Sequence, residues 1–226
     1  MNPPTLSFEA LDRLLDERRS CRAFVDREVP RAMIEQILSA AQRTASWCNA
    51  QPWQVHVLAG AAMERLRAAL HARRHEPSEP DLEWPREYRG VYQERRRACG
   101  WGLYAAVGIE KGDREASERQ SAENFRMFGA PHVAIVSSDA NLGPYGAIDC
   151  GAYVGNFMLA ARSLGLGSVA QAALAARPAV LREHLDIGAD RSIVCGISFG
   201  FPDETHPVNQ WRTTRASVAD VVRWVE

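Results

Sequence analysis

The sequence SIVCGISFGF at residues 192–201 decides the fold. It is mostly apolar, and it is bounded by Asp190 and Arg191 on one side and by Pro202 on the other. A short apolar run between polar residues and a proline is typical of a central β-strand that is buried on both faces. The sequence therefore predicts a sheet whose middle strand is covered by other elements on each side.

Apolar residues elsewhere in the chain have the spacing of further strands and of helices. Predicted strands lie at 52–59, 132–137 and 168–171. Predicted helices begin after Ser7 and Pro30, at about residue 61, at Ala147 and at Pro178. No repeat or low-complexity linker divides the chain. These elements indicate a single α+β domain over residues 1–226, with a central sheet and helices on both of its faces.

Residues 76–125 interrupt this pattern. Pro77, Pro80 and Pro85 break the periodicity, and aromatic residues are mixed with many arginines. A helical hairpin or lid inserted into the domain would suit this composition. Tyr88, Tyr92, Trp101 and Tyr104 are candidates either for lining a substrate site or for filling a hydrophobic core.

The composition excludes several classes of protein. The chain has 226 residues, 46% hydrophobic and 24% charged, which is ordinary for a globular protein. Its 27 basic and 28 acidic residues leave a net charge of −1, so we expect neither nucleic acid nor an anionic membrane as a partner. The five scattered cysteines form no Cys-x-x-Cys pair. Neither a signal peptide nor an 18-residue apolar stretch is evident, so we expect a cytoplasmic protein.

Three short motifs have interpretations that their context weakens. Gly196-Ile197-Ser198-Phe199-Gly200 matches the G-x-S-x-G motif of hydrolases, but Pro202 stands where the required helix should begin. Residues 165–170 match G-x-G-x-x-A, but here a helix precedes the glycines, and Gly165 suits its left-handed end. His71 and His75 have the spacing of metal ligands, but a solvated helix face explains them better, and we expect no metal.

Polar residues alternate directly after the first predicted helix. On an extended chain, Arg18, Ser20 and Arg22 would lie on one side and could meet a phosphate dianion. The alternative is a helix C-terminus with favourably placed cations. The loop 46–53 supplies the edge hydrogen bonds that a flat heterocycle would need, and residues 209–215 form a second cationic turn.

Taken in order, these segments resemble the FMN-dependent nitroreductase family. RRSCRAF at residues 18–24 resembles the family's R-x-S-x-[RK]-x-F signature, and SWCNAQPW at residues 46–53 resembles its S-x-x-N-x-Q-P-W loop. The 209–215 tail is similar to N-x-x-x-T-x-R, and Trp47-Cys48-Asn49 is similar to the branch that reduces nitrobenzoates and nitroaromatic herbicides. The sequence departs from the family pattern where it has Ala45, Ala170 and the pair Ala172-Ala173.

The resemblance implies a three-layer sandwich with a mostly antiparallel sheet, assembled as an intertwined homodimer with FMN bound across the interface. It implies that Arg18, Ser20 and Arg215 hold the FMN phosphate and that Arg22 lies by the pyrimidine edge of the flavin. Ser46 and Asn49 would reach the cofactor from the second subunit. The other implied cofactor-binding residues are Arg19, Trp47, Gln51, Gln171, Ala172 and Ala173.

The implied activity is a ping-pong reduction of nitroaromatics to nitroso or hydroxylamine products. NADPH or NADH passes a hydride to flavin N5, and the acceptor then takes its place, with no catalytic side chain required. The alternatives are the same scaffold acting on quinones, enones or halophenols, and a flavin-binding protein without turnover. The hydrolase interpretation, with Ser198 as its nucleophile, is a further alternative.

Overall fold

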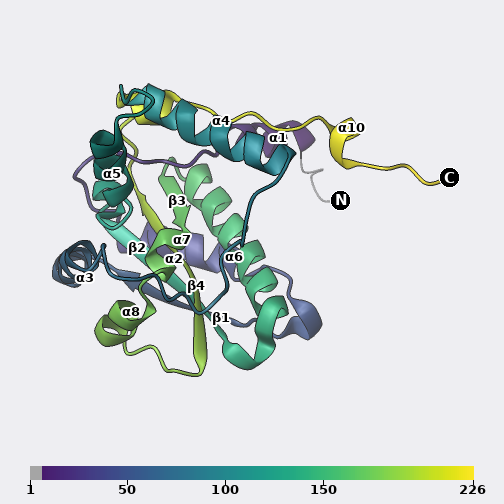
Figure 1. Cartoon of the computed structure of the whole chain (residues 1–226). Coiled ribbons are helices and arrows are strands. Elements are labelled where there is room, and N and C mark those ends of the chain that lie inside the picture. The colour runs from purple at the N-terminus through teal and green to yellow at the C-terminus, as the bar shows by residue number, and fades with distance from the viewer. Residues whose placement is uncertain (1–6) are drawn as a thin grey trace.

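A four-stranded sheet runs through the centre of the protein (Figure 1). The computed structural model describes residues 7–226, so residues 1–6 of the predicted domain lie outside the described part. The strands are β1 (Trp53–Leu58), β2 (His132–Asp139), β3 (Gly167–Gln171) and β4 (Arg191–Gly200). Their order across the sheet is β1-β2-β4-β3, and all neighbours are antiparallel. The prediction of a central strand at 192–201 is confirmed.

The two faces of β4 carry different kinds of side chain. Cys195, Ile197 and Phe199 belong to the hydrophobic core on one side of the sheet. On the other side, a Cβ added to Gly196 would lie 2.4 Å from Leu174 Cδ1. The small residues of the G-x-S-x-G stretch therefore leave room for a neighbouring helix to approach the strand closely.

Helices cover both faces of the sheet, so the fold has three layers (Figure 1). α2 (Arg31–Ala41) and α6 (Gly143–Ser163) pack on one face. On the other face lie α3 (Gly60–Ala72), α7 (Ala172–Ala175) and α8 (Pro178–Leu185). The predicted α+β architecture is confirmed. α6 starts before the predicted Ala147 because Pro144 occupies its first turn, and Gly165, with φ +76°, follows its end as expected.

The 76–125 segment contains two helices, α4 (Val91–Ala106) and α5 (Arg114–Ala122). α4 lies beside α1 (Phe8–Glu17) and the C-terminal segment at the top of Figure 1. The remaining short elements are η1 (Trp47–Asn49), η2 (Met127–Gly129), η3 (Ala140–Leu142), α9 (Pro207–Gln210) and α10 (Val218–Val221). Among the helices of residues 7–226, none is both long enough and apolar enough to cross a membrane.

Candidate active site

The chain that leaves α1 runs alongside the sheet. Arg18 ends the helix in an extended conformation, and Ser20 forms a parallel bridge with Ser168 at the start of β3. The Cys21 amide donates to the Ser168 carbonyl at 3.0 Å. Because this segment is extended and fixed to β3, its successive side chains point in alternate directions.

A cavity of about 530 Å³ lies against this segment. Its other walls come from the C-terminal segment and from α4, which contributes Cys99. Its basic and hydroxyl side chains are Arg18, Arg19, Ser20, Arg22, Arg212, Thr213 and Arg215. Of the predicted cofactor-binding residues, the structure brings Arg18, Arg19, Ser20, Arg22 and Arg215 to this one cavity.

The cavity carries positive charge that the protein itself leaves largely uncompensated. Burial lowers the pKa of the Arg18 guanidinium, and the nearby charge of Arg215 lowers it further. Burial also lowers the pKa of Arg22. Within residues 7–226, neither Arg18 nor Arg22 forms an ion pair with a carboxylate, and Asp16 is the acidic residue that lines the cavity. An anion entering this cavity would relieve the repulsion between these guanidinium groups.

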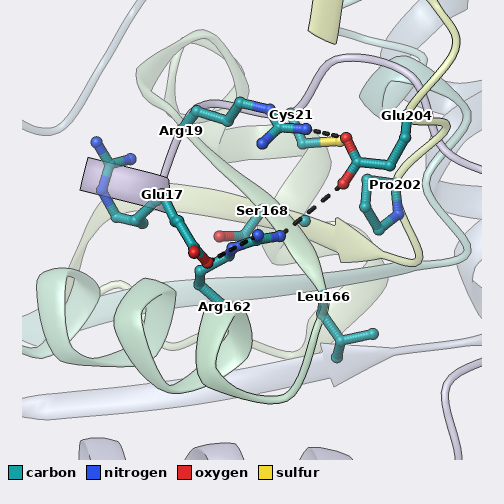
Figure 2. Close-up of a pocket in the computed structure, with 10 residues that line it drawn as sticks. Glu17, Arg19, Cys21, Arg162, Leu166, Ser168, Pro202 and Glu204 are labelled. Atoms are coloured by element: carbon teal, nitrogen blue, oxygen red, sulfur yellow. Dashed lines mark hydrogen bonds and ion pairs between the residues drawn. The ribbon is translucent and has the colours of Figure 1, made fainter. Parts of the chain in front are cut away.

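Arg19 has a different environment from Arg18 and Arg22. Figure 2 shows its guanidinium paired with Glu204, while Arg162 at the end of α6 bridges towards both Glu17 and Glu204. Arg162 lies 3.0 Å from Glu17 and 3.9 Å from Glu204. These ion pairs neutralise Arg19 and join the ends of α1 and α6 to the turn after β4.

Asn209 organises the same region from a fully buried position. Its Oδ1 accepts the Arg22 N–H at 2.8 Å, and its Nδ2 donates to the carbonyls of Ala23 and Asp203 at 2.8 and 2.9 Å. The Arg22 backbone is thereby fixed to the C-terminal segment that carries Arg212 and Arg215. In the sequence, Asn209 is only the first residue of the tail motif, and nothing there indicates that it is buried with these three partners.

The loop that precedes β1 has an unusual backbone. Cys48, Asn49 and Gln51 have positive φ angles of 48°, 55° and 49°. Side chains hold this conformation: Ser46 Oγ accepts the Gln51 N–H at 2.9 Å, and Gln42 Nε2 donates to Gln51 Oε1 at 3.0 Å. Three left-handed non-glycine residues within four positions cost conformational energy, and such strain is concentrated at functional sites.

This loop and the arginine cavity lie near opposite ends of α6. The Trp47 amide donates to Asp149 Oδ2 at 3.1 Å, whereas Glu17, directly before the arginine segment, pairs with Arg162. Asp149 and Arg162 are thirteen positions apart in α6, which corresponds to about 20 Å along the helix axis. Within one chain, the structure therefore does not bring Ser46, Trp47, Asn49 and Gln51 to the cavity.

Gln171, at the end of β3, is buried and fully engaged. Its Nε2 donates to the Asn124 carbonyl at 2.9 Å, and its Oε1 accepts the Ser198 hydroxyl at 2.5 Å. Ala172 and Ala173 follow it as the first residues of α7, where amide N–H groups have no partner within the helix. The side chain of Gln171 is thus committed to the chain itself, and the amides of the next two residues are the groups left for a ligand.

The hydrolase interpretation of Ser198 is wrong. Its side chain is inaccessible to solvent and donates to Gln171 instead of a histidine. His206, the histidine that follows in the sequence, uses Nδ1 to accept the Val208 N–H at the start of α9. The stretch that resembles a nucleophile elbow is the second half of a central strand.

Residues 15–201 match the sequence profile of the nitroreductase family. Nitroreductase NfnB of Mycolicibacterium smegmatis is 36% identical to this chain over 98% of the chain and 95% of that protein. The chain belongs to the nitroreductase family. A 4-nitrobenzoate reductase of Pseudomonas putida is 35% identical, over 93% of each protein. The crystal structure of the FMN-dependent nitroreductase NfnB from Mycobacterium smegmatis in complex with NADPH superposes with a TM-score of 0.92 at 35% identity, covering 96% of this chain and 99% of that one.

In this nitroreductase, the aromatic residues of the 76–125 segment remain accessible. Tyr88, Tyr92 and Trp101 are 43%, 66% and 42% exposed, so they do not fill a core. Trp101 packs edge-on against Tyr104, with ring centroids 6.1 Å apart. None of the four is among the described residues that line the arginine cavity, where α4 contributes Cys99.

Sequence reasoning did not select several residues that shape this nitroreductase site. Cys99, Trp211 and Arg212 line the cavity. In the sequence, Cys99 is one residue of the aromatic-rich insert, and Trp211 and Arg212 belong to the cationic turn, but no motif marks any of them individually. His71 and His75 do not join a cluster of metal-ligating residues, since the described part of the chain holds no group of three or more such side chains.

Proposed function

We propose that this protein is an FMN-dependent NAD(P)H oxidoreductase that reduces the nitro groups of aromatic compounds. The observation that carries the proposal is the cavity beside the 18–22 segment, where Arg18 and Arg22 have no carboxylate partner within residues 7–226, in a fold that matches an FMN-dependent nitroreductase at a TM-score of 0.92. The names of the relatives support nitroaromatics as the acceptors, and the NADPH complex supports a nicotinamide donor.

The residues of the cavity fit FMN. A phosphate dianion needs several convergent cations and hydroxyl donors, and we assign this role to Arg18, Ser20 and Arg215. Arg22, half-buried and without a carboxylate partner within residues 7–226, would hold positive charge beside the flavin ring and stabilise negative charge that develops there. When bound, FMN supplies the redox chemistry: it accepts a hydride from the nicotinamide and passes the electrons to the acceptor.

We further propose that the functional unit is an intertwined homodimer. The distance between the 46–51 loop and the cavity within one chain supports a loop supplied by the second subunit. Exposed apolar side chains also support a partner surface, because Phe8, Tyr145 and Ile148 are 71%, 56% and 63% exposed. The C-terminal segment projects away from the body in Figure 1, and its Trp224 is 83% exposed.

We propose that residues 1–226 form one domain and that 76–125 is a helical insert within it. The family profile matches residues 15–201 and NfnB of Mycolicibacterium smegmatis matches 98% of the chain, so both matches include the insert, which supports a single domain. In this arrangement, Ser46, Trp47, Asn49 and Gln51 contact the partner's flavin, while Ala172 and Ala173 offer backbone amides. The aromatic residues Tyr88, Tyr92, Trp101 and Tyr104 are the candidate acceptor contacts.

An absorbance spectrum of the purified protein tests the proposal. We expect a flavin spectrum that is bleached anaerobically by NADPH or NADH and restored by a nitroaromatic such as 4-nitrobenzoate. Bound flavin that neither donor bleaches would favour a binding protein without turnover. Bleaching that quinones reverse and nitroaromatics do not would favour the quinone alternative, and protein that fails to take up added FMN would contradict the proposal entirely.

A further inference from the structure

A buried arginine lies where both ends of the helical insert meet the rest of the domain. Arg177 follows α7 and immediately precedes α8, and it is only 7% exposed. Its guanidinium forms no ion pair with a carboxylate of residues 7–226. A charged side chain in such a position must be compensated by other means, because an unpaired buried charge is costly.

Backbone carbonyls provide this compensation, and all five N–H groups of Arg177 are used. Nε donates to the Arg73 carbonyl at 3.0 Å, and Nη2 donates to the carbonyls of Arg74 and Glu76. Nη1 donates to the carbonyls of Pro77 and Ala176 at 3.2 and 3.0 Å. Four of these carbonyls belong to the turn that leads from α3 into the insert. No other side chain could satisfy this arrangement, because a lysine has only three N–H donors.

The same side chain also contacts the other end of the insert. The Arg177 guanidinium lies over the ring of Phe125, 5.6 Å from its centroid. Next to Phe125, the Asn124 carbonyl accepts from Gln171, so the segment from Gln171 to Arg177 is bonded to both ends of the insert. A backbone hydrogen bond also joins this segment to the start of the insert, because the Glu79 amide donates to the Ala176 carbonyl at 3.3 Å.

We propose that Arg177 is a positioning residue that fixes both ends of the 76–125 insert against the 171–177 segment. This segment includes Ala172 and Ala173, the proposed flavin contacts, so Arg177 sets where α4 and its aromatic residues lie relative to the acceptor site. The catalytic consequence rests on the proposed function. The structural consequence does not, and it can be measured without activity.

Hydrogen–deuterium exchange of the purified protein, with and without added FMN, tests the structural part. In Arg177→Met, which keeps an unbranched apolar stem and removes the donors of the guanidinium, peptides covering 73–80 and 120–126 should exchange about tenfold faster or more. Exchange in β4 should remain as in the wild type. Arg191→Met is the matched control, because Arg191 donates to the carbonyls of Pro52 and Ser137, away from the insert.

The kinetic part measures acceptor use and cofactor binding in the same variants. In Arg177→Met, the KM for the nitroaromatic should rise about tenfold, whereas the Kd for FMN should stay within about twofold, because Arg18, Ser20 and Arg215 are untouched. Added guanidinium should lower the KM again in Arg177→Ala by occupying the vacated space. If Arg177→Met does not fold, Arg177→Lys, with at most three of the five bonds, should show a smaller change in the same direction.

The outcomes separate this proposal from the proposed function. Wild-type exchange at 73–80 and 120–126 in Arg177→Met would overturn the assignment of Arg177. Faster exchange with an unchanged KM would make Arg177 a purely structural residue and would also overturn it. A wild-type protein that binds no FMN or reduces no nitroaromatic would contradict the proposed function, while the exchange experiment would still decide whether Arg177 fixes the insert.

Discussion

Arg18 and Arg19 are adjacent in the sequence, yet the protein uses them in different ways. The extended backbone directs them to different surroundings, and Glu204 neutralises Arg19 (Figure 2). Arg18 has no such partner in the described part of the chain, and the proximity of Arg215 adds to the cost of its charge. This contrast identifies Arg18 as the residue of the pair that is available to an anionic ligand.

The first prediction concerns the affinity for FMN. Replacing Arg18 or Arg215 by alanine should weaken FMN binding by roughly 1.5–3 kcal/mol, which is about a tenfold to hundredfold increase in Kd, because each variant loses a charge-assisted contact to phosphate. Fluorescence titration of the flavin-free protein with FMN measures this change. The loss should be smaller for riboflavin, which has no phosphate.

A matched variant on the surface serves as the control. Arg31 is exposed at the start of α2, where it pairs with Glu35 at 2.9 Å. Arg31→Ala should bind FMN as the wild type does. If Arg18→Ala and Arg215→Ala retained wild-type affinity, the phosphate site would lie elsewhere in the protein.

The second prediction concerns stability and pH. His132 is buried, which lowers its pKa, and its Nε2 accepts the Val29 N–H at 2.9 Å. The unfolded chain therefore binds this proton more tightly than the folded protein does. As the pH falls below about 6.5, the free energy of unfolding should decrease by up to about 1.4 kcal/mol per pH unit from this group.

Urea unfolding at several values between pH 5 and pH 8 measures this dependence. His132→Gln should have a flatter profile than the wild type over this range, whatever its stability at pH 8. Ser39→Ala, at an exposed position without a titrating group, should follow the wild-type profile. A slope that is identical in His132→Gln and the wild type would assign the acid sensitivity to other groups.

How much of the site could be predicted from the sequence differs from residue to residue. The spacing of Arg18, Ser20 and Arg22 was sufficient to group them, because alternation on an extended chain follows from local geometry. The engagement of Arg19 by Glu204 and of Arg22 by Asn209 depends on residues far away in the sequence. Periodicity carries no information about such contacts, so sequence reasoning could not find them.

At the scale of elements, regular structure was predictable wherever packing is repetitive. β4 and α6 show their burial in long apolar patterns, and Gly165 marks the end of α6. The insert was identified only as a helical hairpin or lid, because its entry is fixed by carbonyl contacts with Arg177 and not by an apolar stripe. No residue of α4 is buried, which explains its weak pattern.

The third prediction concerns the packing of α4 on the C-terminal segment. A Cβ added to Gly102 would lie 2.6–2.7 Å from three atoms of the Trp211 indole. Gly102→Ala should therefore separate the two segments and cost about 1–3 kcal/mol of stability through overpacking. FMN affinity should also fall, because Trp211 lines the arginine cavity. Thermal unfolding and FMN titration measure the two effects.

The same helix provides the control for this change. Gly100 has no atom within 4 Å of an added Cβ. Gly100→Ala should therefore stabilise the protein by about 0.5–1 kcal/mol, since alanine favours the helix over glycine. Equal effects at the two positions would show that α4 does not depend on its contact with Trp211.

At the scale of the whole molecule, α6 separates the two parts of the proposed site. It is 21 residues long, about 30 Å, and it connects the region of the 46–51 loop with the end of the 18–22 segment. In the two-fold symmetric dimer that we propose, the loop of one subunit would lie at the cavity of the other, and the same contact would occur twice. Each site would then combine residues from both chains.

The last prediction tests whether each site combines residues from both chains, by mixing two variants that are each defective in FMN binding. Arg18→Ala damages the cavity, and Asn49→Gly removes a loop side chain while allowing the positive φ of that position. Each homodimer should bind FMN weakly. In a mixed dimer, one site receives both changes and the other receives neither, so equal mixing should restore about a quarter of all sites. Subunits exchanged through mild denaturation and titrated with FMN should therefore recover tight binding that neither parent shows. If the loop and the cavity of one site came from the same chain, every site in the mixture would carry one defect, and no recovery would be seen.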